Sequence, residues 1–178
     1  MAGHNKWVQI KRKKGVTDAQ KSKTFSKLAR LITLESKKAV GNMTAPGLRT
    51  VIEKAKSFNM PSDNIERAVK KGAGGEEGTL EAITYEAYGQ GGVPLIIEAL
   101  TTNRNKASSE IKHILSEHGA ALGAIGSASW AFTKTAEGWV PNTPMKADEV
   151  TQSSIDALLE ELLNNDEVQD IYTNLIEE

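Results

Sequence analysis

Apolar residues in the first half of the chain recur at the three- and four-residue spacing of helices that bury one face. The longest pattern begins at Thr17 or Asp18, either of which can cap a helix, and ends at Gly41-Asn42. Its predicted core-facing residues are Phe25, Leu28, Ala29, Ile32 and Ala39. The opposite face then carries a basic stripe of five residues, namely Lys23, Lys27, Arg30, Lys37 and Lys38.

Two shorter helices are predicted to follow. One starts near Pro46, a residue suited to the first turn of a helix. The other opens at Ser62 or Asp63, where Asp63 and Glu66 resemble a capping box, and ends at Gly72. Their predicted core-facing residues are Leu48, Val51, Ile52, Ala55, Ile65, Ala68 and Val69. Together with the first helix they predict a three-helix bundle.

The pattern changes after residue 78 to a mixture of strands and helices. Strands are predicted at residues 83–88, 93–100, 129–134, 138–140 and 168–172. Helices are predicted at residues 106–118 and from Asp148 or Thr151 onward, the latter burying Ile155, Leu158, Leu159, Leu162 and Leu163. We therefore predict an α+β fold, in which the N-terminal bundle is followed by a two-layer α/β domain with a mostly antiparallel sheet.

Charge divides the chain at the same place as the hydrophobic pattern. Residues 1–75 hold 17 Lys and Arg against 5 Asp and Glu, whereas residues 76–178 hold 5 against 18. The glycine-rich segment 72–78 lies at the change and predicts two domains, a basic one over 1–75 and an acidic one over 76–178. Such an asymmetry favours a polyanion as partner of the basic half, although two halves that simply attract each other would show it too.

The first 16 residues lack apolar periodicity and are expected to form a mobile arm. The arm carries Lys6, Trp7, Lys11, Arg12, Lys13 and Lys14. Cations on such an arm can contact phosphates, and an indole offers a flat face to a base. Trp7 is equally suited to pack the arm onto the bundle. The predicted nucleic-acid-binding residues are the arm together with the basic stripe of the first helix.

Other candidate chemistry is sparse. Arg104 follows a predicted strand and stands at a helix start, where Asn103 or Asn105 is expected to cap, so it is a candidate second contact for an anion. There is no cysteine, and the spacing of the histidines predicts no metal site. No catalytic set is indicated by residue spacing. We expect a non-enzymatic, cytoplasmic monomer without cofactor or membrane association.

Several motifs resemble the YebC/PmpR family. They are the opening residues 1–7, the segment 59–68 from Asn59 to Ala68, the segment 85–92 from Tyr85 to Gly92, and the shorter segments 100–105 and 138–143. The resemblance spans nearly the whole chain, and the motifs occur in the family's order. Asn5 stands where a serine is usual.

The resemblance implies a helical N-terminal domain followed by α/β domains. It also implies one of two functions: a DNA-binding transcriptional regulator, or a ribosome-associated translation factor that binds ribosomal RNA or tRNA and aids synthesis of difficult nascent sequences. Family members usually carry a further α/β domain near the position of residues 134–138. Here about five residues occupy that position, so the chain resembles a shortened member.

Overall fold

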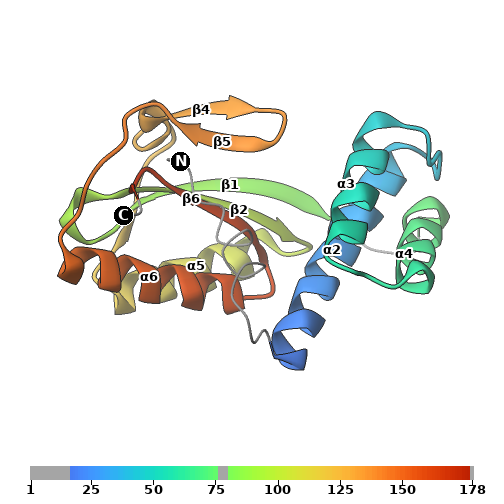
Figure 1. Ribbon diagram of the computed structural model, residues 1–178, viewed down its shortest axis with the longest axis horizontal. Coiled ribbons are helices and arrows are strands. Elements are labelled where there is room, and N and C mark those ends of the chain that lie inside the picture. The colour runs from blue at the N-terminus through green and yellow to red at the C-terminus, as the bar shows by residue number, and fades with distance from the viewer. Residues whose placement is uncertain (1–16, 76–79, 177–178) are drawn as a thin grey trace. The chain divides into compact units, whose positions relative to one another are not determined.

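The computed structural model describes residues 17–75 and 80–176. By their internal contacts these residues belong to two compact units, which meet in sequence at Glu81 and Ala82. The first is the helical unit and the second is the sheet unit (Figure 1). In neither range is there a helix with the length and apolar content needed to cross a bilayer.

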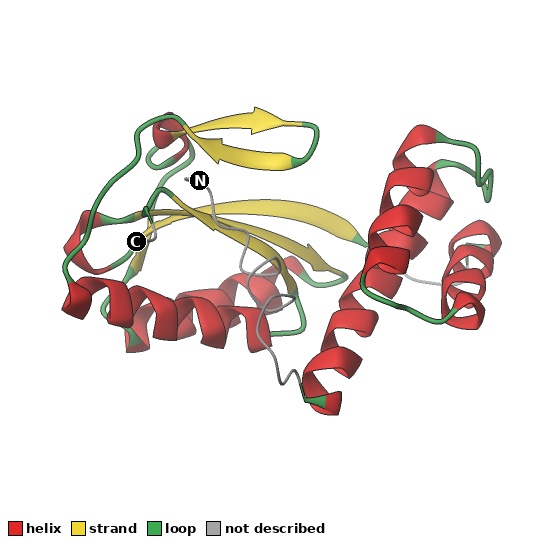
Figure 2. Cartoon of the chain, in the orientation of Figure 1, coloured by secondary structure: helices red, strands yellow, loops and turns green. Residues whose placement is uncertain are grey.

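The helical unit contains three helices within residues 17–75, as the hydrophobic spacing predicts. They are α2 (Asp18–Lys38), α3 (Pro46–Ser57) and α4 (Ser62–Gly74), coloured red in Figure 2. The core that they share contains Leu28, Ile32, Leu48, Ile52, Ala55, Met60, Ile65, Ala68 and Val69. The predicted inward residues Phe25, Ala29, Ala39 and Val51 pack against its edge. One small apolar core therefore holds all three helices.

The start of α2 follows the predicted chemistry, whereas α4 begins at Ser62, one of the two predicted positions, without the predicted capping box. Thr17 caps α2 and forms a reciprocal capping box with Gln20, through two backbone-to-side-chain hydrogen bonds of 3.0 and 3.3 Å. The N-cap of α4 is Pro61, with no side-chain cap. The predicted capping box at Asp63 is therefore wrong, because Asp63 already lies inside the first helical turn. There its negative charge interacts favourably with the positive end of the helix dipole.

Gly72 marks a helix contact and not the predicted helix end. The α4 helix continues to Gly74, and the left-handed conformation needed for termination falls on Gly75. Gly72 is buried where α4 crosses α2: a Cβ there would collide with the carbonyl oxygen of Thr33 and lie 2.7 Å from the Cβ of Ser36. The hydroxyl of Ser36 donates to the carbonyl of Val69 at 2.6 Å. The missing side chain therefore allows the two backbones to approach closely.

The sheet unit is built on four strands in the order β3-β1-β2-β6. Their bounds are β1 Glu81–Tyr88, β2 Pro94–Thr101, β3 Ala121–Leu122 and β6 Val168–Thr173. Both β1 with β3 and β2 with β6 pair antiparallel, and the short helical turn η1 (Gln90–Gly92) joins β1 to β2. The helices α5 (Arg104–Glu117) and α6 (Glu149–Asn164) cover one face of the sheet (Figure 1). The α+β prediction is confirmed, although β3 was not expected.

The two helices of this unit begin at side-chain caps. Asn103, one of the two expected candidates, accepts a hydrogen bond from the backbone N–H of Lys106 at 3.1 Å. Asp148 accepts from the backbone N–H of Thr151 at 2.7 Å, which decides between the two predicted caps of α6. That hydrogen bond also lowers the pKa of Asp148. The five predicted inward residues of α6 are all buried.

A hairpin lies on the other face of the sheet. It consists of β4 (Phe132–Thr135) and β5 (Gly138–Pro141), and its turn occupies the residues where the resemblance places a missing domain. The indole N–H of Trp139 donates to Glu98 on β2 at 3.0 Å. The predicted strand over 129–134 starts late, because Ser129–Ala131 (η2) form a short 3₁₀ turn. As a result Phe132 is buried while Trp130 is 58% exposed.

Glu86 fixes the chain that leads into this hairpin. Its buried carboxylate accepts three backbone hydrogen bonds, from Gly126 and Ala128 at 2.7 Å and from Ser129 at 2.8 Å. Burial opposes ionisation, but these hydrogen bonds outweigh it and hold the pKa of Glu86 below its ordinary value of 4.5. The same loop is tied to Tyr88, whose hydroxyl donates to the carbonyl of Ser127.

We predict that Gly72→Ala destabilises the helical unit by about 1–3 kcal/mol, because the added methyl group forces α2 and α4 apart. Urea denaturation followed by circular dichroism measures this loss. Gly47→Ala is the matched control: its added Cβ meets only the carboxylate end of Glu35, which can move aside. A Gly72→Ala protein as stable as the control would contradict the close helix contact.

Glu86→Gln is expected to cost about 2 kcal/mol at pH 7, because three backbone N–H groups lose a charged acceptor. Since folding lowers the pKa of Glu86, its contribution is present above the unfolded value and is lost as pH falls through the folded one. The stability gap between variant and wild type should therefore shrink below pH 4.5. Glu137→Gln, at an exposed position in the hairpin turn, is the control; a gap that does not change with pH would contradict the assignment.

Candidate nucleic-acid interface

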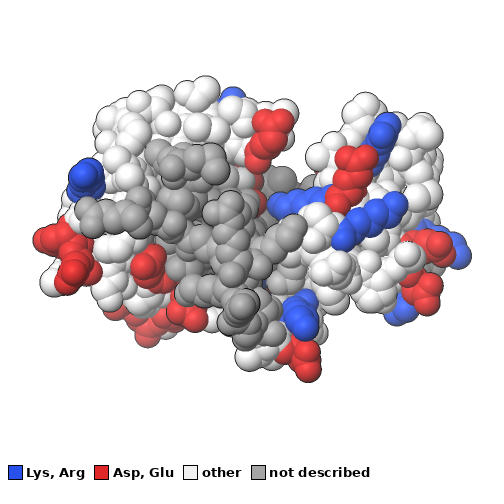
Figure 3. Space-filling model, in the orientation of Figure 1, with Lys and Arg blue, Asp and Glu red and all other residues white. Residues whose placement is uncertain are grey.

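Positive charge is concentrated on the helical unit. Residues 17–75 hold 12 Lys and Arg against 5 Asp and Glu. On the face shown in Figure 3, basic side chains recur over this unit, among a smaller number of acidic ones. The predicted arm residues Lys6, Trp7, Lys11, Arg12, Lys13 and Lys14 lie outside the described residues. Of the predicted contact residues, the structure therefore describes those from α2 onward.

The predicted basic stripe of α2 is open to solvent over only part of its length. Lys23, Lys37 and Lys38 are exposed, and Arg30 is half-buried. Lys27 is an exception, with 3% of its surface accessible and a polar interaction of its own. Its inclusion in an exposed stripe was wrong, because helical periodicity separates polar from apolar faces but not open polar faces from covered ones.

The two lysines at the end of α2 also have a local role. Lys37 and Lys38 lie in the last helical turn, where a cation interacts favourably with the helix dipole. The ammonium group of Lys38 contacts the carboxylate of Glu35 at 2.7 Å. These contacts are partly exposed and contribute little to stability. The carboxylate nevertheless offsets part of the charge that Lys38 offers to a ligand.

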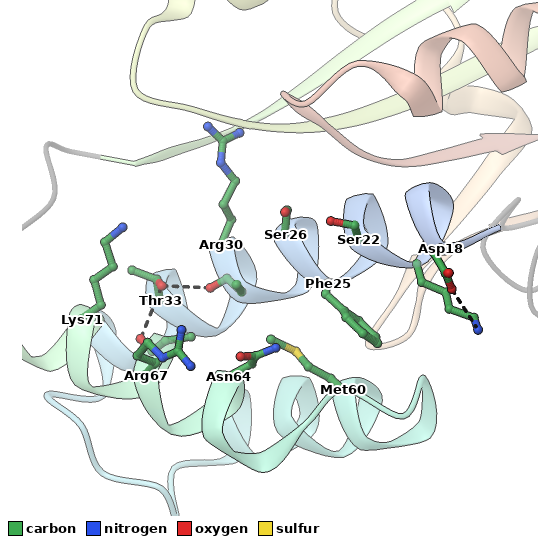
Figure 4. A pocket seen from close by; sticks show the side chains of 13 residues that line it. Asp18, Ser22, Phe25, Ser26, Arg30, Thr33, Met60, Asn64, Arg67 and Lys71 are labelled. Carbon is green, nitrogen blue, oxygen red and sulfur yellow. Dashed lines mark hydrogen bonds and ion pairs between the residues drawn. The ribbon is translucent and has the colours of Figure 1, made fainter. Parts of the chain in front are cut away.

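A groove between α2 and α4 brings together basic residues of two different helices, which the pattern within either helix does not relate. Its volume is about 730 Å³. Figure 4 shows its lining, which comes from α2 on one side and from Met60 and α4 on the other. The lining residues are Asp18, Lys21, Ser22, Phe25, Ser26, Ala29, Arg30, Thr33, Met60, Asn64, Arg67, Ala68 and Lys71. Among the predicted contact residues that the structure describes, Arg30 is the one that lines this groove.

The groove combines an apolar floor with a positively charged rim. Phe25 points from α2 toward α4, close to Met60 (Figure 4). Arg30 points away from α4, so it extends the rim on the α2 side. Four cations face one carboxylate, that of Asp18, which lies 3.8 Å from the ammonium group of Lys21. That ion pair is fully solvated on the Asp18 side and only weakly neutralises Lys21.

Three cations of the rim, Lys21, Arg67 and Lys71, were missed in the sequence. Two of them lie on α4, where Arg67, Lys70 and Lys71 follow one another at helical spacing, so a basic face was available as a signal. The apolar positions of this helix indicate only its buried face and do not reveal this basic one. The pairing of α4 with α2 has no comparable sequence signal, because it depends on how the bundle packs.

Arg104, the candidate second contact, is exposed at the first position of α5. It lies near the phenol of Tyr85. Burial raises the pKa of that phenol, and the charge of Arg104 partly opposes the rise. The charge of Arg104 therefore affects the ionisation of Tyr85 within the sheet unit.

The α2–α4 groove offers several kinds of polar group to a ligand. Within residues 17–75 and 80–176, no group of three or more His, Cys, Asp or Glu side chains is placed to hold a metal ion. The α2–α4 groove offers ammonium and guanidinium groups for phosphates. It also offers hydroxyl and amide groups for directional hydrogen bonds, and an apolar floor.

Comparisons with known proteins agree with one another over most of the chain. Residues 5–75 match the family described as "TACO1/YebC protein N-terminal domain", and residues 80–137 match "TACO1/YebC second and third domain". A "Probable transcriptional regulatory protein" of Chlorobaculum parvum is 44% identical over 94% of this chain and 67% of its own length. One of Aquifex aeolicus with the same description is 44% identical over 97% of this chain and 70% of its own.

A solved structure shows the same fold. The crystal structure of a conserved hypothetical protein from Aquifex aeolicus superposes with a TM-score of 0.83 and is 32% identical. The superposition covers 97% of this chain and 98% of that one. Both family matches and the 44% identity to the Chlorobaculum parvum relative show that the chain belongs to the TACO1/YebC family.

Proposed function

We propose that the protein is a non-enzymatic regulator of gene expression that binds nucleic acid through its basic helical unit. The observation that carries the proposal is the excess of cations on residues 17–75, part of which converges on the α2–α4 groove. Phosphates attract such a surface regardless of sequence, which supplies affinity and a strong dependence on salt. The relatives named as probable transcriptional regulatory proteins support a regulatory role.

DNA is the first candidate target. The names of the relatives favour a transcriptional regulator, which would contact duplex DNA through the arm and the exposed lysines of α2, with Arg104 as a second contact. In this proposal the phosphate contacts position the protein on the duplex, and any sequence preference requires further contacts with base edges.

A ribosome-associated translation factor is the second candidate. The observation in its favour is the size of the groove, which is in the range of small-ligand sites and far too small for a double helix. Folded RNA presents unpaired bases in loops and bulges that can enter such a site. Ribosomal RNA and tRNA are then the expected partners, and the acidic sheet unit would be free to face basic ribosomal proteins.

The arm is tested by replacing Lys11, Arg12, Lys13 and Lys14 with Ala in the full chain. We expect affinity for a fluorescein-labelled nucleic acid to fall at least tenfold, because several phosphate contacts are lost. The slope of log affinity against log salt should become shallower for the same reason. Unchanged circular dichroism confirms the fold, and unchanged affinity would remove the arm from the proposal.

Sedimentation of the protein in cell lysate distinguishes the two targets. We expect the protein to migrate with a nucleic-acid-containing fraction at low salt and to leave it at moderate salt. Migration with ribosomes that survives DNase would establish the translation role. Retention on nucleoid material that DNase abolishes would establish DNA binding instead. A protein that stays at the top of the gradient at low salt would contradict both.

A further inference from the structure

We propose that the α2–α4 groove is a binding site for unpaired nucleotides of a single-stranded RNA segment, with a base on its apolar floor and the flanking phosphates on its rim. The inference rests on the proposed function, since it specifies the ligand of the same basic unit. It goes further in naming the class of nucleic acid and the residues that distinguish it from a duplex.

The first argument is the combination of surfaces in one groove. A duplex offers phosphates on the outside and keeps its bases stacked inside, so a cationic surface is sufficient to hold it. An apolar floor adds nothing to that contact. Here Phe25, Ala29 and Met60 line the same groove as Lys21 and Arg67. An unstacked nucleotide is a ligand that uses both surfaces, because its base is flat and largely apolar at its faces.

The second argument is the shape of the groove. A volume of about 730 Å³ lies in the range of sites that enclose a small organic ligand. Along α2 the lining extends from Asp18 to Thr33, which is about 22 Å at the helical rise. A short stretch of single strand fits this length, with a base or two lowered between the helices.

The third argument is that the walls are preformed. The hydroxyl of Thr33 donates to the carbonyls of Ala29 at 2.8 Å and Ala68 at 3.4 Å, and both bonds are drawn in Figure 4. Together with the contact at Gly72, they fix α4 against α2 just below the groove. Phe25 packs on the edge of the bundle core, which restricts its ring. A rigid floor lowers the entropy lost on binding.

The fourth argument is the presence of directional polar groups beside the floor. Asn64 projects from α4 into the groove near Met60 (Figure 4). Its amide can donate to and accept from the edge of a base. Arg67, one turn further along α4, presents a planar guanidinium that can bind a phosphate through two parallel hydrogen bonds or stack on a base. An acidic peptide would satisfy the cations but has little use for a flat aromatic floor.

The test measures binding of the full-length chain to two fluorescein-labelled probes by anisotropy. The probes are a twelve-nucleotide oligouridine and an RNA hairpin duplex with the same number of phosphates. We expect Phe25→Leu to weaken binding of oligouridine about fivefold or more, since stacking is lost while the apolar volume is kept. Binding of the duplex should change less than twofold. Asn64→Ala should act in the same direction on the single strand.

Charge variants provide the matched control. Arg67→Gln is expected to weaken oligouridine binding and to reduce the salt slope by about 0.7 for the lost phosphate contact. Arg49→Gln removes the same charge from an exposed position on α3, outside the groove, and should leave the single-strand affinity within twofold. Thermal unfolding of each variant by circular dichroism ensures that only folded proteins are compared.

The outcomes separate the inference from the proposed function. If wild-type protein binds both probes and the groove variants equal Arg49→Gln, the groove site is overturned while nucleic-acid binding stands. If neither probe binds at low salt, both proposals fail. If polyglutamate displaces oligouridine as well as unlabelled oligouridine does, the groove is a site for acidic peptides and the nucleotide assignment is overturned. Loss confined to the single strand in Phe25→Leu and Asn64→Ala establishes it.

Discussion

The close approach of α2 and α4 is the constraint on which the helical unit depends. Gly72 has no side chain at the crossing, and Thr33 and Ser36 of α2 use their hydroxyls to bond carbonyls of α4. Small and hydroxylated residues therefore replace the bulky apolar contacts that usually separate two helices. This crossing lies near the C-terminal ends of both helices, and the open groove extends from it along α2 from Thr33 to Asp18 and along α4 from Lys71 to Asn64. The packing that stabilises the unit also shapes its candidate site.

The sheet unit is organised by a different kind of constraint. Its apolar core lies between the sheet and the helices α5 and α6, where inward residues of α6 are buried in the expected pattern. The opposite face carries a second apolar cluster, of Ile96, Ala128, Ala131, Phe132 and Tyr172. Polar contacts accompany it, with Glu98 bonded to Trp139 and Glu86 bonded to three backbone N–H groups. A buried carboxylate is costly without partners, so these hydrogen bonds are a condition for its presence. They hold the loop that leads from β3 to the hairpin.

Membership of the TACO1/YebC family and the charge distribution support the same proposed function by separate routes. The relatives carry names of transcriptional regulators, whereas the physical surface indicates a polyanion partner without specifying which one. The groove adds a geometric criterion, because its dimensions suit unpaired nucleotides. The choice between a duplex and a single-stranded segment therefore rests on base exposure in the ligand, which a positively charged surface alone does not distinguish.

The sequence by itself determined the helices, most of the strands and the charge of each half. Three- and four-residue apolar spacing located α2, α3 and α6, and the excess of lysine and arginine identified a basic N-terminal half, because periodicity and composition are local properties of the chain. Only the tertiary structure decided which individual residues are buried, which lie at helix contacts and which line the groove. It buried Lys27, placed Gly72 inside a helix crossing, and joined Phe25 to Arg67, which are 42 positions apart in the sequence, in one groove. Those outcomes depend on which faces of different helices meet, and no periodicity within one helix encodes the position of its neighbour.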